Sequence, residues 1–272
     1  MLLDRRSIEI RQTVVRMLEF SRRGHLGAAF SIVEILRVLY DGILRYNPVD
    51  PQWKDRDRFL LSKGHGCLSL YAILAEKGFF SEEELWKFCQ RDGILGGHPE
   101  HSVPGVEAST GSLGHGLSIG IGFALNARID DTGYRVFVVI GDGESNEGSV
   151  WEAALCASKH MLSNLTILID YNKHQSYAST FEVMNLEPLA DKWRSFGFEV
   201  YEVDGHDVEA LQSLLSGLSD QSKKPGKPNA VICHTVKGKG VEFAENNMEW
   251  HHKSSISDED LHALYDALEI GQ

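Results

Sequence analysis

Two short runs of Val, Ile and Leu limit what this chain can fold into. Residues 136–140 read Val-Phe-Val-Val-Ile and residues 165–169 read Leu-Thr-Ile-Leu-Ile, and the stretch between them is long enough for a crossover helix. Continuous apolar runs joined in this way are typical of buried parallel strands. The two strands would therefore end at one edge of a sheet, which is where ligands bind in open α/β sheets.

Polar residues follow both of these runs. Gly141, Asp142 and Gly143 follow the first, and Asn172 follows the second. A carboxylate and an amide oxygen, with a nearby backbone carbonyl, suit Mg²⁺, which completes its shell with phosphate oxygens and water. The glycines let the backbone approach a phosphate, and the next helix would point its amide groups at the anion. An Asp between glycines is often only a turn, but its place at a strand end favours a metal-bound diphosphate.

The rest of the chain alternates between helix and strand patterns. Capping boxes are indicated at Ser31 and Ser81, a capped helix is predicted to begin near Ser257, and Gly24 would close the first helix. Residues 222–228 are predicted to be a loop. The candidate strands are residues 58–61, 135–140, 165–170, 198–203 and 230–234. This order predicts an α/β fold with a doubly wound, mainly parallel sheet.

Composition restricts the class of protein. A chain of 272 residues, 42% of them hydrophobic, can bury one large core, so residues 1–272 are predicted to form a single domain. A net charge of −12 argues against nucleic acid or an anionic membrane surface as a partner. Four cysteines without paired spacing are expected to be reduced. The charged amino terminus and the absence of a long apolar stretch predict a cytoplasmic protein.

Five separated motifs resemble, in the same order, the amino-terminal half of transketolase. They include the Gly-His pairs at His25, His65, His98 and His115, and a final segment that runs from residue 237 to residue 251. The motifs lie at residues 22–29, 56–66, 96–100, 110–116 and 237–251. The resemblance covers almost the whole chain, and the Gly-Asp-Gly and Asn pair resembles the thiamine diphosphate motif.

The resemblance implies a cofactor site for thiamine diphosphate and Mg²⁺, with Ca²⁺ or Mn²⁺ as substitutes. Asp142, Asn172 and the backbone carbonyl of His174 would hold the metal, and His65 would contact the diphosphate. Gly111 and Leu113 would touch the aminopyrimidine through backbone groups, with His115 as a neighbour. The cofactor-binding set also includes Gly141, Gly143, Glu144 and Glu147. Glu147 matches a family glutamate near the interface between cofactor sites, but it fits equally well as an acid in the first turn of a helix.

The same resemblance assigns His25, His98 and His251 to a donor-sugar channel, where they would bind hydroxyls and help to move protons. His98 and His101 also form an H-x-x-H pair that suggests zinc. No Cys or carboxylate ligands stand at a suitable spacing, so we discount a zinc site.

The carboxylate that activates the aminopyrimidine has no counterpart in this sequence. In the family it lies on a second domain, so the chain resembles the amino-terminal subunit of a split transketolase. Such an enzyme moves a two-carbon ketol unit from a ketose, expected here to be phosphorylated, to an aldose. It would need a separate carboxy-terminal subunit, and pairs of this chain would also associate, giving a heterotetramer.

Two departures from the family leave the donor sugar open. His252 stands where the family usually has Gly, and the loop that begins at Gln175 lacks a common glycine. Xylulose 5-phosphate and a more specialised ketose are equally compatible. Other possibilities are a 2-oxoacid dehydrogenase component, a deoxyxylulose phosphate synthase and a non-catalytic cofactor-binding subunit. The motifs at His25 and His98 favour ketose chemistry, and neither a G-x-G-x-x-G after the first strand nor a Walker motif is found.

Overall fold

The computed structural model describes residues 3–219 and 226–270 and contains one five-stranded sheet. All pairings are parallel, in the order β1-β2-β3-β5-β4. The strands are β1 (Arg58–Leu61), β2 (Val136–Gly141), β3 (Leu165–Tyr171), β4 (Glu199–Asp204) and β5 (Asn229–His234). Each predicted strand is confirmed to within one residue. The loop predicted at residues 222–228 lies largely outside the described residues.

The register of β2 and β3 places the two polar strand ends side by side. Val136 pairs with Leu165 and Gly141 pairs with Asp170, so the chain leaves both strands at the same edge of the sheet. Asp142 follows directly, and its backbone N–H donates to the carbonyl of Asp170 at 3.2 Å. The sheet order therefore brings the segments after β2 and β3 together, as the sequence predicts.

Helices cover both faces of the sheet. Along the chain they are α1 (Arg5–Ser21), α2 (Leu26–Phe30), α3 (Val33–Val38), η1 (Leu39–Ile43), η2 (Gly64–Gly66), α4 (Cys67–Glu76), η3 (Glu82–Lys87), α5 (Gly116–Ile129), η4 (Gly143–Asn146), α6 (Gly148–Lys159), α7 (Thr180–Val183), α8 (Leu189–Ser195), α9 (Val208–Ser219), η5 (Met248–Trp250) and α10 (Asp258–Ala267). None of those in the described part of the chain combines the length and the apolar character that crossing a bilayer requires.

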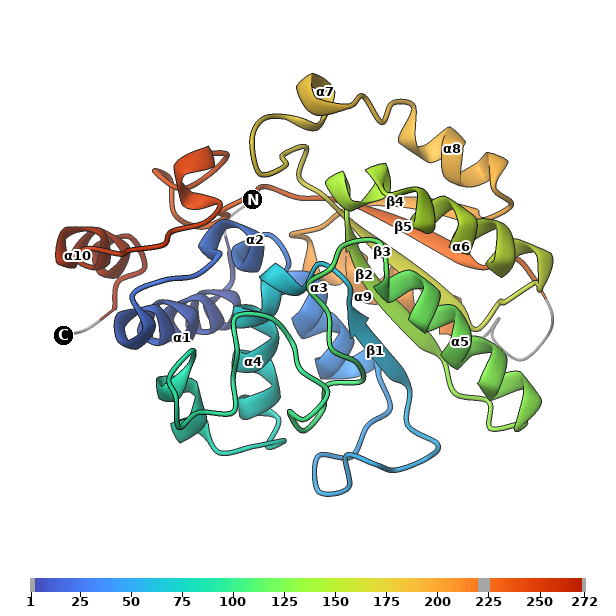
Figure 1. The fold of residues 1–272 in the computed structure, drawn as a ribbon, viewed down its shortest axis with the longest axis horizontal. Coiled ribbons are helices and arrows are strands. Elements are labelled where there is room, and N and C mark those ends of the chain that lie inside the picture. The colour runs from blue at the N-terminus through green and yellow to red at the C-terminus, as the bar shows by residue number, and fades with distance from the viewer. Residues whose placement is uncertain (1–2, 220–225, 271–272) are drawn as a thin grey trace.

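Alternate residues of each strand enter two different cores. Phe137 and Val139 of β2 pack into a core with α1 to α4, α9 and α10, whereas Val136, Val138 and Ile140 pack into a core with α5, α6 and α8. Figure 1 shows α5 and α6 on one side of the sheet, with α3 and α9 on the other. A parallel sheet covered on both faces needs strands that are apolar throughout. The doubly wound prediction is confirmed.

The first helix ends before the predicted glycine. Arg22 adopts the left-handed conformation (φ 56°), and its N–H donates to the carbonyl of Leu18 at 2.8 Å. Gly24 instead forms an isolated antiparallel bridge with Lys253. The prediction that Gly24 closes the helix is therefore wrong, because a long-range backbone pairing uses this glycine.

The predicted capping boxes have different outcomes. Ser257 forms one at the start of α10. Ser81 caps η3 by accepting from the N–H of Glu83, but the reciprocal bond that would complete a box is absent there. Ser31 closes α2 rather than opening α3, and its hydroxyl donates to the carboxylate of Asp170 at 2.7 Å. The box at Ser31 is wrong, because the side chain is drawn to a buried carboxylate far along the sequence.

Candidate functional site

The loops after β2 and β3 are tied together through Asp142. Its buried carboxylate accepts hydrogen bonds from the backbone N–H of Gly143 at 2.7 Å and of Lys173 at 2.5 Å. Asn172 is also buried; its side-chain oxygen accepts from the N–H of His174 at 3.0 Å. The structure thus brings the three predicted metal ligands, Asp142, Asn172 and the peptide group of His174, to one edge of the sheet.

Two buried lysines lie beneath this edge, and the sequence prediction did not include them. Lys63 pairs with the fully buried Asp170 and donates to the carbonyl of Ala28 at 3.0 Å. Lys237 donates from Nζ to the carbonyl of His174 at 3.0 Å. Both stand inside motifs that were recognised, next to glycines, but their burial depends on partners elsewhere in the chain.

The electrostatics of this edge favour a bound cation and anion together. Burial, and then the charge of Asp170, raises the pKa of Asp142 to about 7. Burial and the neighbouring Lys63 lower the pKa of Lys237 to about 8. Asp170 keeps a pKa below its usual range because Lys63 outweighs the effect of burial. A metal cation next to Asp142 would stabilise its ionised form.

Glycines in the strand-end loops allow a close approach of other groups. A Cβ at Gly143 would lie 2.7 Å from Cγ of Gln175, and one at Gly111 would lie 3.0 Å from Cδ2 of His98. A Cβ at Gly64 would stand 2.9 Å from the hydroxyl of Thr110. These loops are packed against one another so closely that larger residues would separate them.

Several buried polar atoms near this edge have no hydrogen-bond partner among the described residues. Of eight such side-chain atoms, four belong to the segments around the site: Ser145 Oγ, Asn146 Oδ1, Gln175 Nε2 and His251 Nδ1. Buried polar groups normally have a hydrogen-bond partner, so each of these atoms is available to hydrogen-bond a ligand or a water molecule. Together with the oxygen ligands and the two ammonium groups, they fit a metal-bound diphosphate.

Glu144 connects three of the recognised motifs. Its carboxylate accepts from the hydroxyl of Ser62, from the N–H of Gly114 at 2.8 Å and from the N–H of Gly141 at 3.1 Å. Burial raises its pKa. Its bonds within the protein make Glu144 a support for the loops that are expected to bind the cofactor. Glu147 is exposed at the start of α6, and its side chain makes no capping bond.

The loop before α5 carries the residues expected near the aminopyrimidine. The hydroxyl of Thr110 donates to the carbonyl of Leu61 at 2.7 Å and fixes the loop beside β1. Gly111 lies under the ring of His98, and Leu113 is half-buried. His115 is exposed, with Nδ1 3.1 Å from the carbonyl of Leu113.

Five histidines gather at the same end of the molecule. The ring of His25 lies 5.6 Å from that of His65, 6.0 Å from that of His98 and 5.8 Å from that of His251, measured between centroids. The fifth, His252, lies 4.4 Å from His25. The structure therefore brings the four predicted histidines together and adds His252, which the sequence had marked only as a departure from the family.

The imidazoles of His25, His65, His98 and His251 are neutral near pH 7. Burial, and then His252 and His98, lower the pKa of His25 to about 4, whereas burial and Lys237 lower that of His251 to about 3. Burial also lowers the pKa of His65 strongly and that of His98. A neutral imidazole both donates and accepts hydrogen bonds, which suits sugar hydroxyls.

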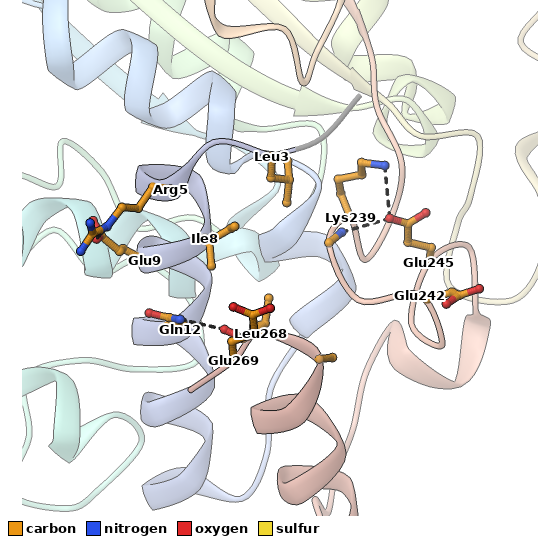
Figure 2. Close-up of a pocket in the computed structure, with 12 residues that line it drawn as sticks. Leu3, Arg5, Ile8, Glu9, Gln12, Lys239, Glu242, Glu245, Leu268 and Glu269 are labelled. Atoms are coloured by element: carbon orange, nitrogen blue, oxygen red, sulfur yellow. Dashed lines mark hydrogen bonds and ion pairs between the residues drawn. The ribbon is translucent and has the colours of Figure 1, made fainter. Parts of the chain in front are cut away.

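A cavity of about 220 Å³ opens between the histidines, and none of the described residues that line it is acidic. A larger cavity of about 780 Å³ lies away from them, between α1, α10 and residues 239–245, and Figure 2 shows its lining. Its lining includes four glutamates, and its cations are engaged, Arg5 with Glu9 and Lys239 with Glu245. Of these two cavities, the smaller one suits an anionic or hydroxylated ligand.

A zinc site has no support in the part of the chain that the structure describes. No three His, Cys, Asp or Glu side chains there are arranged to hold a metal ion. His101, the partner of His98 in the H-x-x-H pair, lies instead beside the hydroxyl of Ser109 at 3.3 Å. A magnesium site built from one carboxylate, one amide and one backbone carbonyl does not depend on such a group.

Comparisons with known proteins agree with this arrangement. An apulose-4-phosphate transketolase subunit from Phocaeicola vulgatus is 40% identical over 250 residues, which are 92% of this chain and 88% of that protein. The 6-deoxy-6-sulfo-D-fructose transketolase subunit SqwG of a Clostridium species is 41% identical, over 84% of this chain and 82% of its own length.

Solved structures give the same result. A transketolase from Pichia stipitis in complex with sedoheptulose 7-phosphate superposes with a TM-score of 0.88 at 31% identity. The match covers 97% of this chain but 40% of that one, so the chain spans less than half of the solved enzyme. The family model described as transketolase, thiamine diphosphate binding domain, matches residues 4–271. The chain therefore belongs to the transketolase family, as a thiamine diphosphate binding domain.

Proposed function

We propose that this chain is the amino-terminal subunit of a two-subunit transketolase, which transfers a two-carbon ketol unit from a ketose to an aldose. The observation that carries the proposal is that three neutral histidines, His25, His65 and His98, line one cavity, with His251 beside them, at the edge of the sheet that also holds Asp142 and Asn172. A metal-bound diphosphate and a hydroxylated substrate would thus bind side by side. We propose that residues 1–272 form one domain, since both cores share a single sheet.

For the metal, we assign the Asp142 carboxylate, the Asn172 side-chain oxygen and the His174 carbonyl to Mg²⁺, with Ca²⁺ or Mn²⁺ as substitutes. All three are hard oxygen ligands, and their placement on adjacent strand ends supports the assignment. Gly141 and Gly143 give the diphosphate room, and Lys237 contributes positive charge close to the metal site. His65 would donate to the diphosphate.

When bound, thiamine diphosphate supplies the carbon nucleophile and holds the electron pair released when the substrate carbon–carbon bond breaks. The residues of this chain bind and orient the reactants. Gly111 and Leu113 offer backbone groups to the aminopyrimidine, with His115 and Glu147 nearby. His25, His98 and His251 bind donor hydroxyls, and Nδ1 of His251, which has no partner within the described chain, is placed to hydrogen-bond one of them.

The proposed enzyme requires a complementary subunit, which supplies the carboxylate that activates the aminopyrimidine. The names of the two relatives, both of them transketolase subunits, support this. So do exposed apolar side chains in the loop after His174 and in and after α7, which follows it: Tyr177 is 92% exposed, Phe181 73% and Met184 59%. Ser176 of this loop lies 3.2 Å from Nε2 of His251, so the apolar surface borders the site.

We further propose a heterotetramer in which two copies of this chain associate, within the cytoplasm. Leu155 is 60% exposed on α6, the helix that follows the predicted diphosphate loop, which supports a contact there. The donor is proposed to be a ketose with an anionic group, since the two relatives are named for a phosphorylated and a sulfonated sugar. The identity of the sugar is left open.

The test is to purify the tagged chain from its native lysate with thiamine diphosphate and Mg²⁺ present, and to identify the proteins that accompany it by mass spectrometry. We expect a stoichiometric partner that carries the pyrimidine-binding half of a transketolase. The variants Tyr177→Asp and Phe181→Asp should lose this partner. Val49→Asp is the matched control, because Val49 is equally exposed in the loop before β1, and it should retain the partner. Recovery of the chain alone, as a homo-oligomer, would contradict the proposal.

A further inference from the structure

His252 is the nearest neighbour of the histidine at the centre of the cluster. The ring centroids of His25 and His252 are 4.4 Å apart, with 37° between the ring planes, whereas the other three imidazoles lie between 5.6 and 6.0 Å from His25. His252 is exposed, and it is one of the residues that line the cavity of about 220 Å³. It therefore stands at the opening of the cavity, against one face of His25.

The backbone fixes this arrangement. Gly24 and Lys253 exchange two hydrogen bonds, each of 3.0 Å, in an antiparallel bridge. His25 follows Gly24 and His252 precedes Lys253, so the bridge places these two residues opposite each other. A Cβ at Gly24 would lie 2.7 Å from a methyl of Leu18, so the chain can pass here only because the side chain is absent. Any side chain at position 252 would accordingly project beside His25.

A second contact strengthens the bridge. A Cβ at Gly27 would lie 3.0 Å from the carbonyl oxygen of Trp250, and Lys253 places its ammonium 4.5 Å from the centre of the Trp250 ring. The segment that carries His251 and His252 is thus held against the start of α2 from both ends. Its two imidazoles reach His25 from different directions, His251 at a ring angle of 80° and His252 at 37°.

The chemistry of the cavity limits what it can take. Its imidazoles are His25, His65, His98 and His252, Arg23 adds a cation, and Leu68 and Phe88 add apolar surface. Burial keeps the first three neutral near pH 7, so they recognise hydroxyl groups by donating and accepting hydrogen bonds. A small cavity with such a lining fits a polyhydroxylated carbon chain, and its width is set by the side chains that form its walls.

We propose that His252 is a specificity-determining residue for the donor ketose: its ring forms one wall of the cavity and holds His25 in the orientation that binds the sugar. The inference rests on the proposed ketol transfer and adds to it the residue that selects the donor. Removing the ring opens space beside His25, so a branched ketose gains access and a linear ketose loses a contact.

The test uses the complex of this chain with its carboxy-terminal subunit, loaded with thiamine diphosphate and Mg²⁺. The constants kcat and KM are measured for one linear and one branched ketose phosphate. For His252→Gly we expect KM for the linear donor to rise about 10-fold with kcat little changed, and the branched-to-linear ratio of kcat/KM to rise at least about 10-fold. His252→Phe keeps a ring of similar width and should retain the wild-type ratio of kcat/KM between the two donors. His262→Gln, an exposed histidine on α10, is the matched control and should change neither value.

A second measurement reports on the positioning role without catalysis. Imidazole signals in nitrogen–proton correlation spectra of the folded chain should move for His25 in His252→Gly and stay in place in His262→Gln. If the wild-type complex transfers no ketol unit from any ketose, the proposed function itself fails, and this inference fails with it. If the wild type is active but His252→Gly keeps its donor ratio within about two-fold, only the role of His252 is overturned.

Discussion

Nζ of Lys237 lies 3.0 Å from the carbonyl oxygen of His174. Lys237 opens the segment that ends with His251, and His174 follows the predicted metal ligand Asn172 by two residues. This hydrogen bond therefore connects the edge of the sheet where we propose that the diphosphate binds with the segment that brings His251 beside His25. The buried ammonium group of Lys237 lies at the proposed diphosphate site. The other end of the same segment carries His251, which lies beside His25.

Lys237→Met is expected to weaken the binding of thiamine diphosphate. The ammonium group of Lys237 lies close to the proposed metal site, and a charged hydrogen bond from it to the diphosphate would contribute about 1.5–3 kcal/mol, so the affinity should fall about 10- to 100-fold. Lys237→Arg keeps the charge and should lose less. Isothermal titration calorimetry with Mg²⁺ present measures both. Lys239→Met is the matched control, because Lys239 pairs with Glu245 beside the other cavity, and an equal loss there would contradict the account.

Asp142→Asn should abolish the dependence of cofactor binding on Mg²⁺. The amide keeps the shape of the side chain but removes the charge that pairs with the metal, and a neutral oxygen is a weaker ligand. Titrations with Mg²⁺ and with a chelator should give the same weak affinity for this variant, whereas the wild type should bind tightly only with the metal. Asp191→Asn, at an exposed pair with Arg194, should behave as the wild type. Tight, metal-dependent binding by Asp142→Asn would rule out the assigned site.

The central histidines are expected to stay neutral well below pH 6.5. With pKa values of about 4 for His25 and about 3 for His251, their imidazole signals should not titrate between pH 5 and pH 7. In the unfolded chain both would take up protons near pH 6.5. Their contribution to stability is therefore complete above that pH and falls as the pH drops toward 4 for His25 and toward 3 for His251. Nuclear magnetic resonance titration checks this, and a midpoint near 6.5 for His25 would contradict it.

A buried ion pair between α1 and α3 should be essential for stability. Arg11 and Glu34 lie 2.6 Å apart, and Nδ1 of His206 lies 2.8 Å from the same carboxylate. Although burial would raise it, the pKa of Glu34 is lowered to about 2 by Arg11 and His206. Glu34→Gln leaves the guanidinium without a charge partner and should cost about 3–5 kcal/mol of unfolding free energy.

Urea denaturation monitored by circular dichroism measures that loss. The contribution of Glu34 is present above about pH 4.5, the value in the unfolded chain, and decreases as the pH falls toward 2. The difference between the wild type and Glu34→Gln should therefore shrink at acid pH. An exposed pair, Arg194 with Asp191, offers the control, since its removal should change stability by less than about 1 kcal/mol. Equal urea midpoints at neutral pH would refute the role of Glu34.

The strands and the position of the candidate metal site could be read from the sequence because their signals are local. A continuous apolar run such as residues 136–140 is needed on both faces of a covered sheet, and parallel strands place the residues that follow them at one edge. Asp142 and Asn172 come together for that reason alone. The four histidines were predicted from their motifs. In the structure, the glycines of these motifs allow the loops that carry the histidines to pack closely together.

Other features depend on contacts far along the chain. Ser31 looks like a helix cap, but its hydroxyl bonds to Asp170, and Lys63 pairs with the same carboxylate. Gly24 looks like a helix end, but it pairs with Lys253. A local pattern cannot distinguish a buried lysine from a solvated one when its partner is more than a hundred residues away. The place of His252 against His25 follows from the same long-range bridge.

The most direct test of the account is a ketol-transfer assay on the chain reconstituted with the complementary subunit recovered from its native lysate. A ketose donor labelled at its first two carbons is supplied with an aldose, thiamine diphosphate and Mg²⁺, and the label in the new ketose is measured. We expect transfer that needs both subunits and the metal and that is lost in Asp142→Asn. Transfer by this chain alone, or by the complex carrying Asp142→Asn, would contradict this expectation.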